Sequence, residues 1–115
     1  MITVKVKNSG ELVATNVQTA NNPYTRILGL MFKPNMNGMG GLLLNPCNSI
    51  HTFFMRFPID VIFLSQDNKV IKIHRNMVPW RMSWIYFKAR KTLELPSGSL
   101  PTSVQEGSQL EVEVV

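Results

Sequence analysis

The sequence predicts an all-β domain, a β-sandwich or partly open barrel, with one short helix near its N-terminal end. Three observations lead to this class. Short runs of residues alternate apolar and polar side chains, as half-buried strands do. Turn-forming residues separate these runs, and strands do not alternate with helices as they would in an α/β fold. The length of 115 residues fits one domain over 1–115.

The N-terminal residues predict a β-hairpin. Apolar residues alternate with Thr and Lys over 2–7, and the segment 11–17 returns after the turn sequence NSG at 8–10. The remaining predicted strands span 42–45, 50–55, 59–65, 69–76, 91–96 and 108–115. Turn residues separate them at 66–69 and 96–99.

A short helix is predicted over residues 23–32. Asn22 can cap it, and Pro23 suits the first helical position because its missing N–H would be unpaired there anyway. Gly29 interrupts the pattern at a cost of about 1 kcal/mol relative to Ala, which close packing against a neighbour would explain. Pro34 ends the helix.

The charge balance favours acidic partners. The chain has 12 Lys and Arg against 7 Asp and Glu, a net charge of +5. The cations are scattered, and their closest cluster, KARK at 88–91, is too short for a nucleic-acid-binding arm. We therefore expect a small molecule or peptide, acidic in character, rather than a nucleic acid.

Membrane spans and disulfides are not expected. No apolar run approaches the roughly 20 residues that cross a bilayer, so we expect a soluble chain. Residues 1–10 alternate apolar and charged side chains, unlike a signal peptide, which favours a cytoplasmic location and leaves a mature secreted domain open. Cys47 is the only cysteine, and we interpret it as a structural thiol rather than a nucleophile.

The stretch SIHTFFMRFPIDVIFL at 49–64 surrounds a few polar groups with apolar ones. Strand parity places His51 and Met55 on one face, and makes Asp60 the one polar group of an apolar row. A buried carboxylate needs a partner. The candidates are backbone N–H groups of a turn, Arg56, Arg81 or Arg26. We favour Asp60 and His51 as structural groups, and the alternative is an acid–base pair.

Two other polar groups are candidates for a site. Glu94 alternates with apolar neighbours, so we expect it to face solvent, and the alternative is a pocket shared with Asp60 and His51. The loop MVPWRMSW at 77–84 places Trp80 beside Arg81, a combination common in recognition surfaces. The alternative, equally favoured, is that Trp80 covers one end of the sandwich while Arg81 binds backbone carbonyls or Asp60.

No metal and no cofactor are predicted. Side chains that could bind copper are present: His51, Met55, Cys47, Met36 and Met39. They lack the tight spacing of a metal motif. The second histidine, His74, follows the strand alternation and is expected to face solvent.

Several of these segments together resemble the DUF192 family of uncharacterised prokaryotic proteins. They are RILGLMF at 26–32, IHTFFMRFPIDVIFL at 50–64, VPWR at 78–81, LELPSG at 93–98 and VQEGSQL at 104–110. The resemblance implies a jelly-roll-like β fold and no established activity. Its motif positions here are Arg26, Gly29, Leu30, Met31, His51, Thr52, Met55, Pro58, Asp60, Pro79, Trp80, Arg81, Glu94 and Gly98. Lys33 and Ser108 depart from the usual pattern.

The preferred functional hypothesis is a binding domain without catalysis. A small ligand or peptide would lie against Met55, Trp80, Arg81 and His51, where apolar lining meets a few polar groups. The first alternative is a hydrolase-like enzyme in which His51 acts with Asp60 or Glu94. The second alternative is a structural or assembly module, and the oligomeric state stays open.

Overall fold

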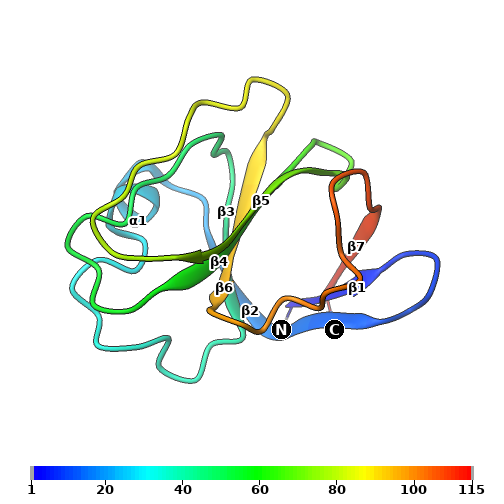
Figure 1. The fold of residues 1–115 in the computed structure, drawn as a ribbon, viewed down its shortest axis with the longest axis horizontal. Helices are drawn as coiled ribbons and strands as arrows, with labels where there is room; N and C mark the ends of the chain where they lie inside the picture. The colour runs from blue at the N-terminus through cyan, green and yellow to red at the C-terminus, as the bar shows by residue number, and fades with distance from the viewer. Residues whose placement is uncertain (1, 115) are drawn as a thin grey trace.

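One curled sheet of seven strands organises the chain (Figure 1). The computed structural model describes residues 2–114. Its elements are β1 (Ile2–Val6), β2 (Leu12–Ala20), α1 (Pro23–Leu28), β3 (Gly41–Leu44), β4 (Ile59–Leu64), β5 (Val70–Met77), β6 (Lys91–Pro96) and β7 (Leu110–Val114). The order across the sheet is β5-β4-β6-β3-β2-β1-β7. Only β2 and β3 run parallel, and the other neighbours are antiparallel.

The two edges of this sheet meet at one end. The Val70 N–H donates to the Ser108 carbonyl at 2.9 Å, and the Gly107 N–H donates to the Val70 carbonyl at 2.8 Å. A β-bridge joins Lys69 to Gln109 beside them. The predicted all-β class is therefore confirmed, with the partly open barrel as its form.

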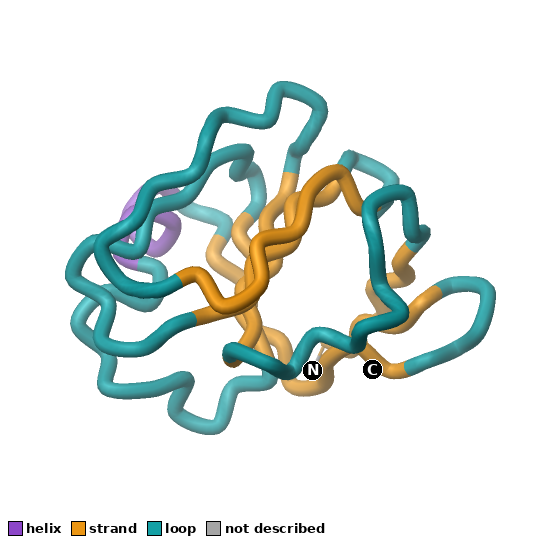
Figure 2. Tube along the Cα trace, viewed as in Figure 1, coloured by secondary structure: helices purple, strands orange, loops and turns teal. Residues whose placement is uncertain are grey.

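Each face of the sheet carries its own apolar cluster, because strand side chains alternate between faces. Ile62 and Leu93 belong to the cluster inside the curl. Val61 and Phe63 belong to the cluster on the opposite face. In Figures 1 and 2, α1 and the loops that follow α1, β3 and β5 gather on one side of the strands. The second cluster packs against residues of these loops, so both faces are covered.

The predicted hairpins are confirmed, whereas the predicted strand over 50–55 is wrong. β1 pairs antiparallel with β2, and β4 pairs with β5 across the turn at 66–69. Residues 50–58 form turns instead, with a single bridge from His51 to Met82. This segment pairs with the loop around Met82 rather than joining the sheet, so the alternation of its side chains did not reflect a strand.

Helix α1 is shorter than predicted. The Asn22 side chain accepts a hydrogen bond from the Thr25 N–H at 2.8 Å, so the predicted cap is present. The helix ends at Leu28 because Gly29 adopts φ 46° and ψ −118°, a conformation that favours glycine. Among residues 2–114, no helix is long and apolar enough to cross a bilayer.

Candidate functional site

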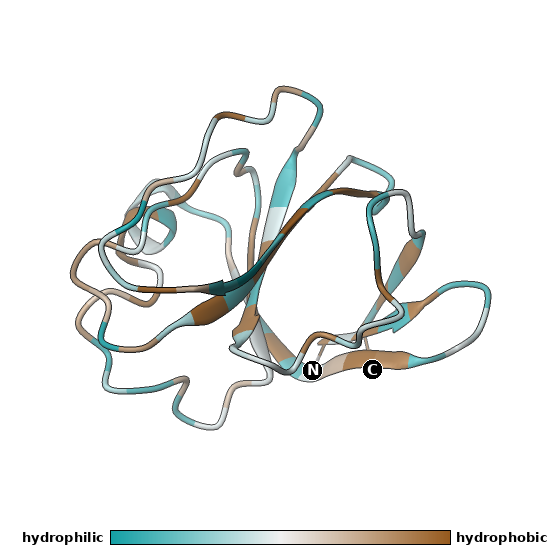
Figure 3. Ribbon diagram, viewed as in Figure 1, coloured by the Kyte–Doolittle hydropathy of each residue, from teal (hydrophilic) through white to brown (hydrophobic). Residues whose placement is uncertain are grey.

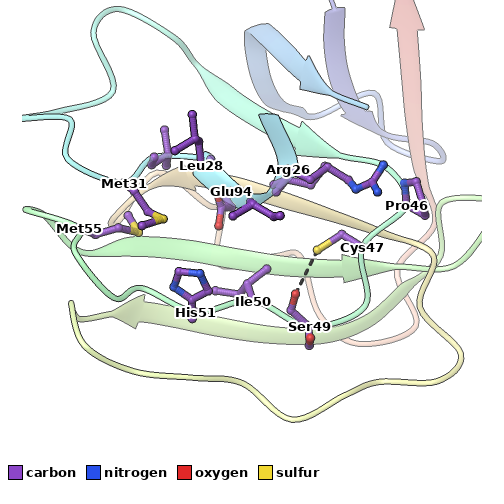
Figure 4. Close-up of a pocket in the computed structure, with 14 residues that line it drawn as sticks. Arg26, Leu28, Met31, Pro46, Cys47, Ser49, Ile50, His51, Met55 and Glu94 are labelled. Carbon is purple, nitrogen blue, oxygen red and sulfur yellow. Dashed lines mark hydrogen bonds between the residues drawn. The ribbon is translucent and has the colours of Figure 1, made fainter. Parts of the chain in front are cut away.

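A cavity of about 230 Å³ lies between α1, the loop that follows β3, and the sheet (Figure 4). Most of its lining is apolar, including Leu28, Met31, Leu44, Ile50 and Met55. The side chains of the lining that are polar or can ionise are Arg26, Cys47, Ser49, His51 and Glu94. In the view of Figure 4, Met31 and Met55 lie toward one end of the cavity, while Arg26 and Cys47 lie toward the other.

Glu94 is the buried acid of this cavity. It lies on β6, in the middle of the sheet, where Leu42 and Val61 are its strand partners. Its side chain is 4% exposed, and its Oε1 atom has no hydrogen-bond partner among the described residues. Burial raises the pKa of this carboxyl to about 8. The prediction that Glu94 faces solvent is therefore wrong, because α1 and the loops cover its face.

The end of α1 explains how the carboxyl is enclosed. A Cβ atom at Gly29 would lie 3.9 Å from the Glu94 Oε1 atom and 3.8 Å from the Arg26 carbonyl oxygen. Gly29 therefore brings the backbone after the helix directly over the acid. A Cβ atom at these distances would make only ordinary contacts, so the positive φ of 46°, rather than a lack of space, is what favours glycine at the helix end.

His51 shares the cavity with Glu94. The Phe53 N–H donates to the His51 Nδ1 atom at 3.2 Å, so the neutral ring carries its proton on Nε2. The ring stacks on Phe53 with centroids 5.2 Å apart. The structure thus brings together three of the predicted site residues, His51, Met55 and Glu94.

Asp60 lies on the other face of the sheet. Its register partner on β6 is Leu95, the neighbour of Glu94, so the two carboxylates point to opposite faces. Asp60 accepts hydrogen bonds from the backbone N–H groups of Asn76 at 2.8 Å, Gly98 at 3.0 Å and Leu100 at 3.1 Å. These bonds tie the turn after β6 to the sheet. The hypothesis of a pocket shared by Asp60 and Glu94 is wrong, and Asp60 has the structural role that the sequence favoured.

Trp80 and Arg81 lie outside the cavity lining. Trp80 packs edge-on against Phe54, with ring centroids 4.9 Å apart. Arg81 is exposed, and its guanidinium donates to the Trp80 carbonyl at 3.4 Å. The buried Thr52 hydroxyl donates to the Val78 carbonyl at 2.7 Å and accepts from the Arg81 N–H at 2.9 Å. Thr52 therefore fixes this loop against the segment that carries His51.

The remaining cysteine and histidine have local partners. The Cys47 thiol donates to the Ser49 carbonyl at 3.1 Å, and burial raises its pKa. His74 is half-buried, with Nε2 2.9 Å from the Tyr86 hydroxyl, so the prediction that it faces solvent is wrong. Within residues 2–114, no three His, Cys, Asp or Glu side chains are grouped as a metal site would require.

Reasoning from the residues alone missed several lining residues. Arg26, Gly29 and Met31 were identified as motif positions and were not assigned to a site. Leu28 and Ile50 were not proposed as site residues. The interruption of the helical pattern by Gly29 was the one local signal, because glycine is unfavourable inside a helix and favoured at its end.

Related proteins share the fold and carry no established activity. Residues 4–112 match the DUF192 family, described as "Uncharacterized ACR". A UPF0127 protein of Thermococcus sibiricus is 32% identical over 113 residues, covering 94% of this chain and 73% of the relative. A UPF0127 protein of Pyrococcus furiosus is 36% identical over 106 residues, covering 89% and 90%.

Two solved structures match with a TM-score of 0.79 each. One is a protein of unknown function from Novosphingobium aromaticivorans, 20% identical, covering 96% of this chain and 82% of that one. The other, from Sinorhizobium meliloti and described as a candidate transcription regulator, is 25% identical and covers 96% and 91%. On the family match and the archaeal relatives, this chain belongs to the DUF192 family.

Proposed function

We propose that this protein is a binding domain that takes the amino group of a small ligand, or of a peptide side chain, into the cavity beneath α1. This proposal rests on the Glu94 Oε1 atom, which is buried in the cavity lining and has no hydrogen-bond partner within residues 2–114. A buried polar group without a partner costs free energy in the empty protein. A ligand that donates a hydrogen bond to it recovers that cost on binding.

The rest of the lining favours an amine with an apolar body. An ammonium group is the best partner for a buried carboxylate, because it supplies both a proton and the opposite charge. Leu28, Leu44 and Ile50 surround the carboxyl with aliphatic surface. Met31 and Met55 add flexible side chains that adapt to the shape of a ligand. A short alkylamine or an amino acid fits this chemistry.

An acid–base enzyme is the second candidate, because His51 and Glu94 line the same cavity. In this function the neutral carboxyl of Glu94 would act as the acid and His51 as the base. Asp60 would take no part, since its carboxylate lies on the other face and already accepts three backbone hydrogen bonds. Turnover of a bound amine or amide by the parent, lost in His51→Ala, separates this candidate from simple binding.

A thermal-shift comparison tests the binding function. Alkylamines, diamines and amino acids are added to the parent, to Glu94→Gln and to Glu111→Gln, a control that removes an exposed carboxylate. Each amine is paired with its N-acetylated analogue, which has no charge on nitrogen. We expect an amine to stabilise the parent and the control but not Glu94→Gln, and its acetylated analogue to stabilise none. Equal stabilisation of Glu94→Gln, or no stabilisation by any amine, would reject the proposal.

A further inference from the structure

Three large aromatic side chains cluster on the surface near the cavity. Phe32, Phe54 and Trp80 are 61%, 48% and 56% exposed. The Phe32 and Phe54 ring centroids are 5.4 Å apart, and those of Phe54 and Trp80 are 4.9 Å apart. Scattered single apolar residues are normal on a protein surface, whereas a contiguous apolar patch marks an interaction site.

The backbone of all three residues is in the left-handed region. Their φ angles are 65° for Phe32, 63° for Phe54 and 67° for Trp80. Bulky residues rarely adopt this conformation, and such strained residues gather at functional sites. Backbone hydrogen bonds hold them there, since the Phe32 N–H donates to the Phe54 carbonyl at 2.9 Å and the Trp80 N–H to the Thr52 carbonyl at 3.0 Å. All three side chains in these strained positions are exposed.

The chain after Trp80 carries more exposed apolar side chains. Met82, Trp84 and Phe87 are 70%, 81% and 83% exposed. Backbone hydrogen bonds from Ser83 to Ile50 and from Tyr86 to Asn48 fix this segment against the loop that follows β3. In Figure 1, the segment 78–90 projects beyond the strands on the side away from the chain termini, and Figure 3 shows apolar stretches along it. We call the side chains of Phe32, Phe54, Trp80, Met82, Trp84 and Phe87 the loop surface.

The charges within the two segments that carry the loop surface are all positive. The two segments 21–58 and 76–91 contain no Asp or Glu. The exposed cations within them are Lys33, Arg56, Arg81, Lys88 and Arg90. The acidic residue nearest in sequence to the second segment, Glu94, is buried. The loop surface therefore combines projecting apolar side chains with neighbouring cations, and the segments that carry them contain no acidic residue.

We propose that the loop surface docks onto an anionic lipid bilayer. Trp and Phe side chains insert at the boundary between headgroups and acyl chains, and Lys and Arg attract anionic headgroups. Trp84 and Phe87 project almost fully into solvent, so a protein partner would need a preformed pocket for each, whereas lipid adapts to them. A nucleic acid would make little use of the aliphatic Met82. This proposal stands apart from ligand binding by the cavity.

The two tryptophans make the test specific, because Trp80 and Trp84 are the only tryptophans in the chain and both belong to the loop surface. The full chain is titrated with phosphatidylcholine vesicles, with or without phosphatidylserine, and tryptophan emission is followed. We expect a blue shift with the anionic vesicles, quenching by brominated acyl chains, and loss of binding at high salt. The emission of the protein alone at increasing concentration, and with a single-stranded oligonucleotide, is recorded in parallel.

Two charge-reversal pairs locate the interaction. The first double variant, Lys88→Glu with Arg90→Glu, reverses two exposed cations of the segment 76–91. The second, Lys7→Glu with Lys69→Glu, makes the same charge change at exposed positions outside the segments 21–58 and 76–91. We expect the first pair to lower vesicle partitioning at least about tenfold, since each cation near an anionic surface contributes to binding. The second pair should have a smaller effect.

Several results would overturn the proposal. One is the absence of a blue shift with anionic vesicles. Another is equal partitioning of the protein to neutral and anionic vesicles. A third is an equal loss of vesicle partitioning in the two charge-reversal pairs. A blue shift on self-association alone would assign the surface to a second copy of the chain instead. A response to the oligonucleotide without one to vesicles would assign it to a nucleic acid.

Discussion

Replacing Glu94 by Gln should make the protein less sensitive to pH. Glu94 lies in the apolar cluster under α1, and its pKa is raised from 4.5 to about 8. Because a pKa difference of one between the folded and unfolded states is worth about 1.4 kcal/mol, the raised pKa costs the folded state about 3 kcal/mol at pH 7. The Gln side chain has nearly the same shape and no ionisation.

The direction in which the free energy of unfolding changes with pH follows from the number of protons bound by the folded and unfolded chains. Between the unfolded and folded pKa values, from pH 4.5 to about 8, the folded protein holds a proton that the unfolded chain has released. The free energy of unfolding therefore falls as pH rises through this window. From pH 5 to pH 8, the parent should lose about 4 kcal/mol relative to Glu94→Gln. Other titrating groups, such as His74, are present in both chains, and their effects cancel in the difference.

Urea unfolding at pH 5, 6, 7 and 8 measures this difference, with tryptophan fluorescence as the signal. Glu111→Gln is the matched control, because it removes a carboxylate that is exposed. We expect the control to follow the parent at every pH. If Glu94→Gln also follows the parent, Glu94 titrates normally, and its burial does not have the energetic consequence argued above.

Three further substitutions test the fold around the site by urea unfolding. Asp60→Asn should cost about 3 kcal/mol, because it weakens three hydrogen bonds from backbone N–H groups to a buried carboxylate, and the thermal shifts caused by ligands should be unchanged. A loss under about 1 kcal/mol would contradict this expectation. Gly40→Ala should be more destabilising than Gly38→Ala, because a Cβ at Gly40 would lie 1.7 Å from a backbone oxygen, whereas Gly38 has open space and only an unfavourable φ of 80°. Equal losses would refute this reasoning. Thr52→Val should cost about 2 kcal/mol, because it removes the two hydrogen bonds of the hydroxyl to the 78–81 loop, and it should speed proteolysis of that loop. Unchanged stability and cleavage would show that Thr52 does not fix the loop.

The strands could be predicted because their side chains alternate with the period of a sheet. This pattern identified β4 and β6 and placed Asp60 and Glu94 on definite faces of their strands. The same pattern failed over 50–55, where alternating residues form turns. Nothing in the sequence shows that Phe54 adopts a positive φ, because this conformation depends on tertiary contacts.

The site was only partly predictable for a similar reason. Alternation gives the face of Glu94 but not what covers that face, and the cover comes from α1, far away in sequence. His51 and Met55 were identified as candidates, yet the strand argument that grouped them was wrong. They share the cavity because the turns of 50–58 place them there. Asp60 was correctly interpreted, since a buried carboxylate beside a turn finds backbone N–H groups.

A carbon-13 NMR titration of the Glu94 carboxyl, without and with a saturating amine, would measure its pKa in the free and the bound protein. We expect a midpoint near pH 8 in the free protein, because burial disfavours the charged carboxylate and no group within residues 2–114 bonds to its Oε1 atom. We expect a lower midpoint with the amine bound, because an ammonium group stabilises the carboxylate. A midpoint near the ordinary 4.5 in the free protein would show that burial does not perturb Glu94, and a midpoint that the amine leaves unchanged would show that the amine does not bind beside it.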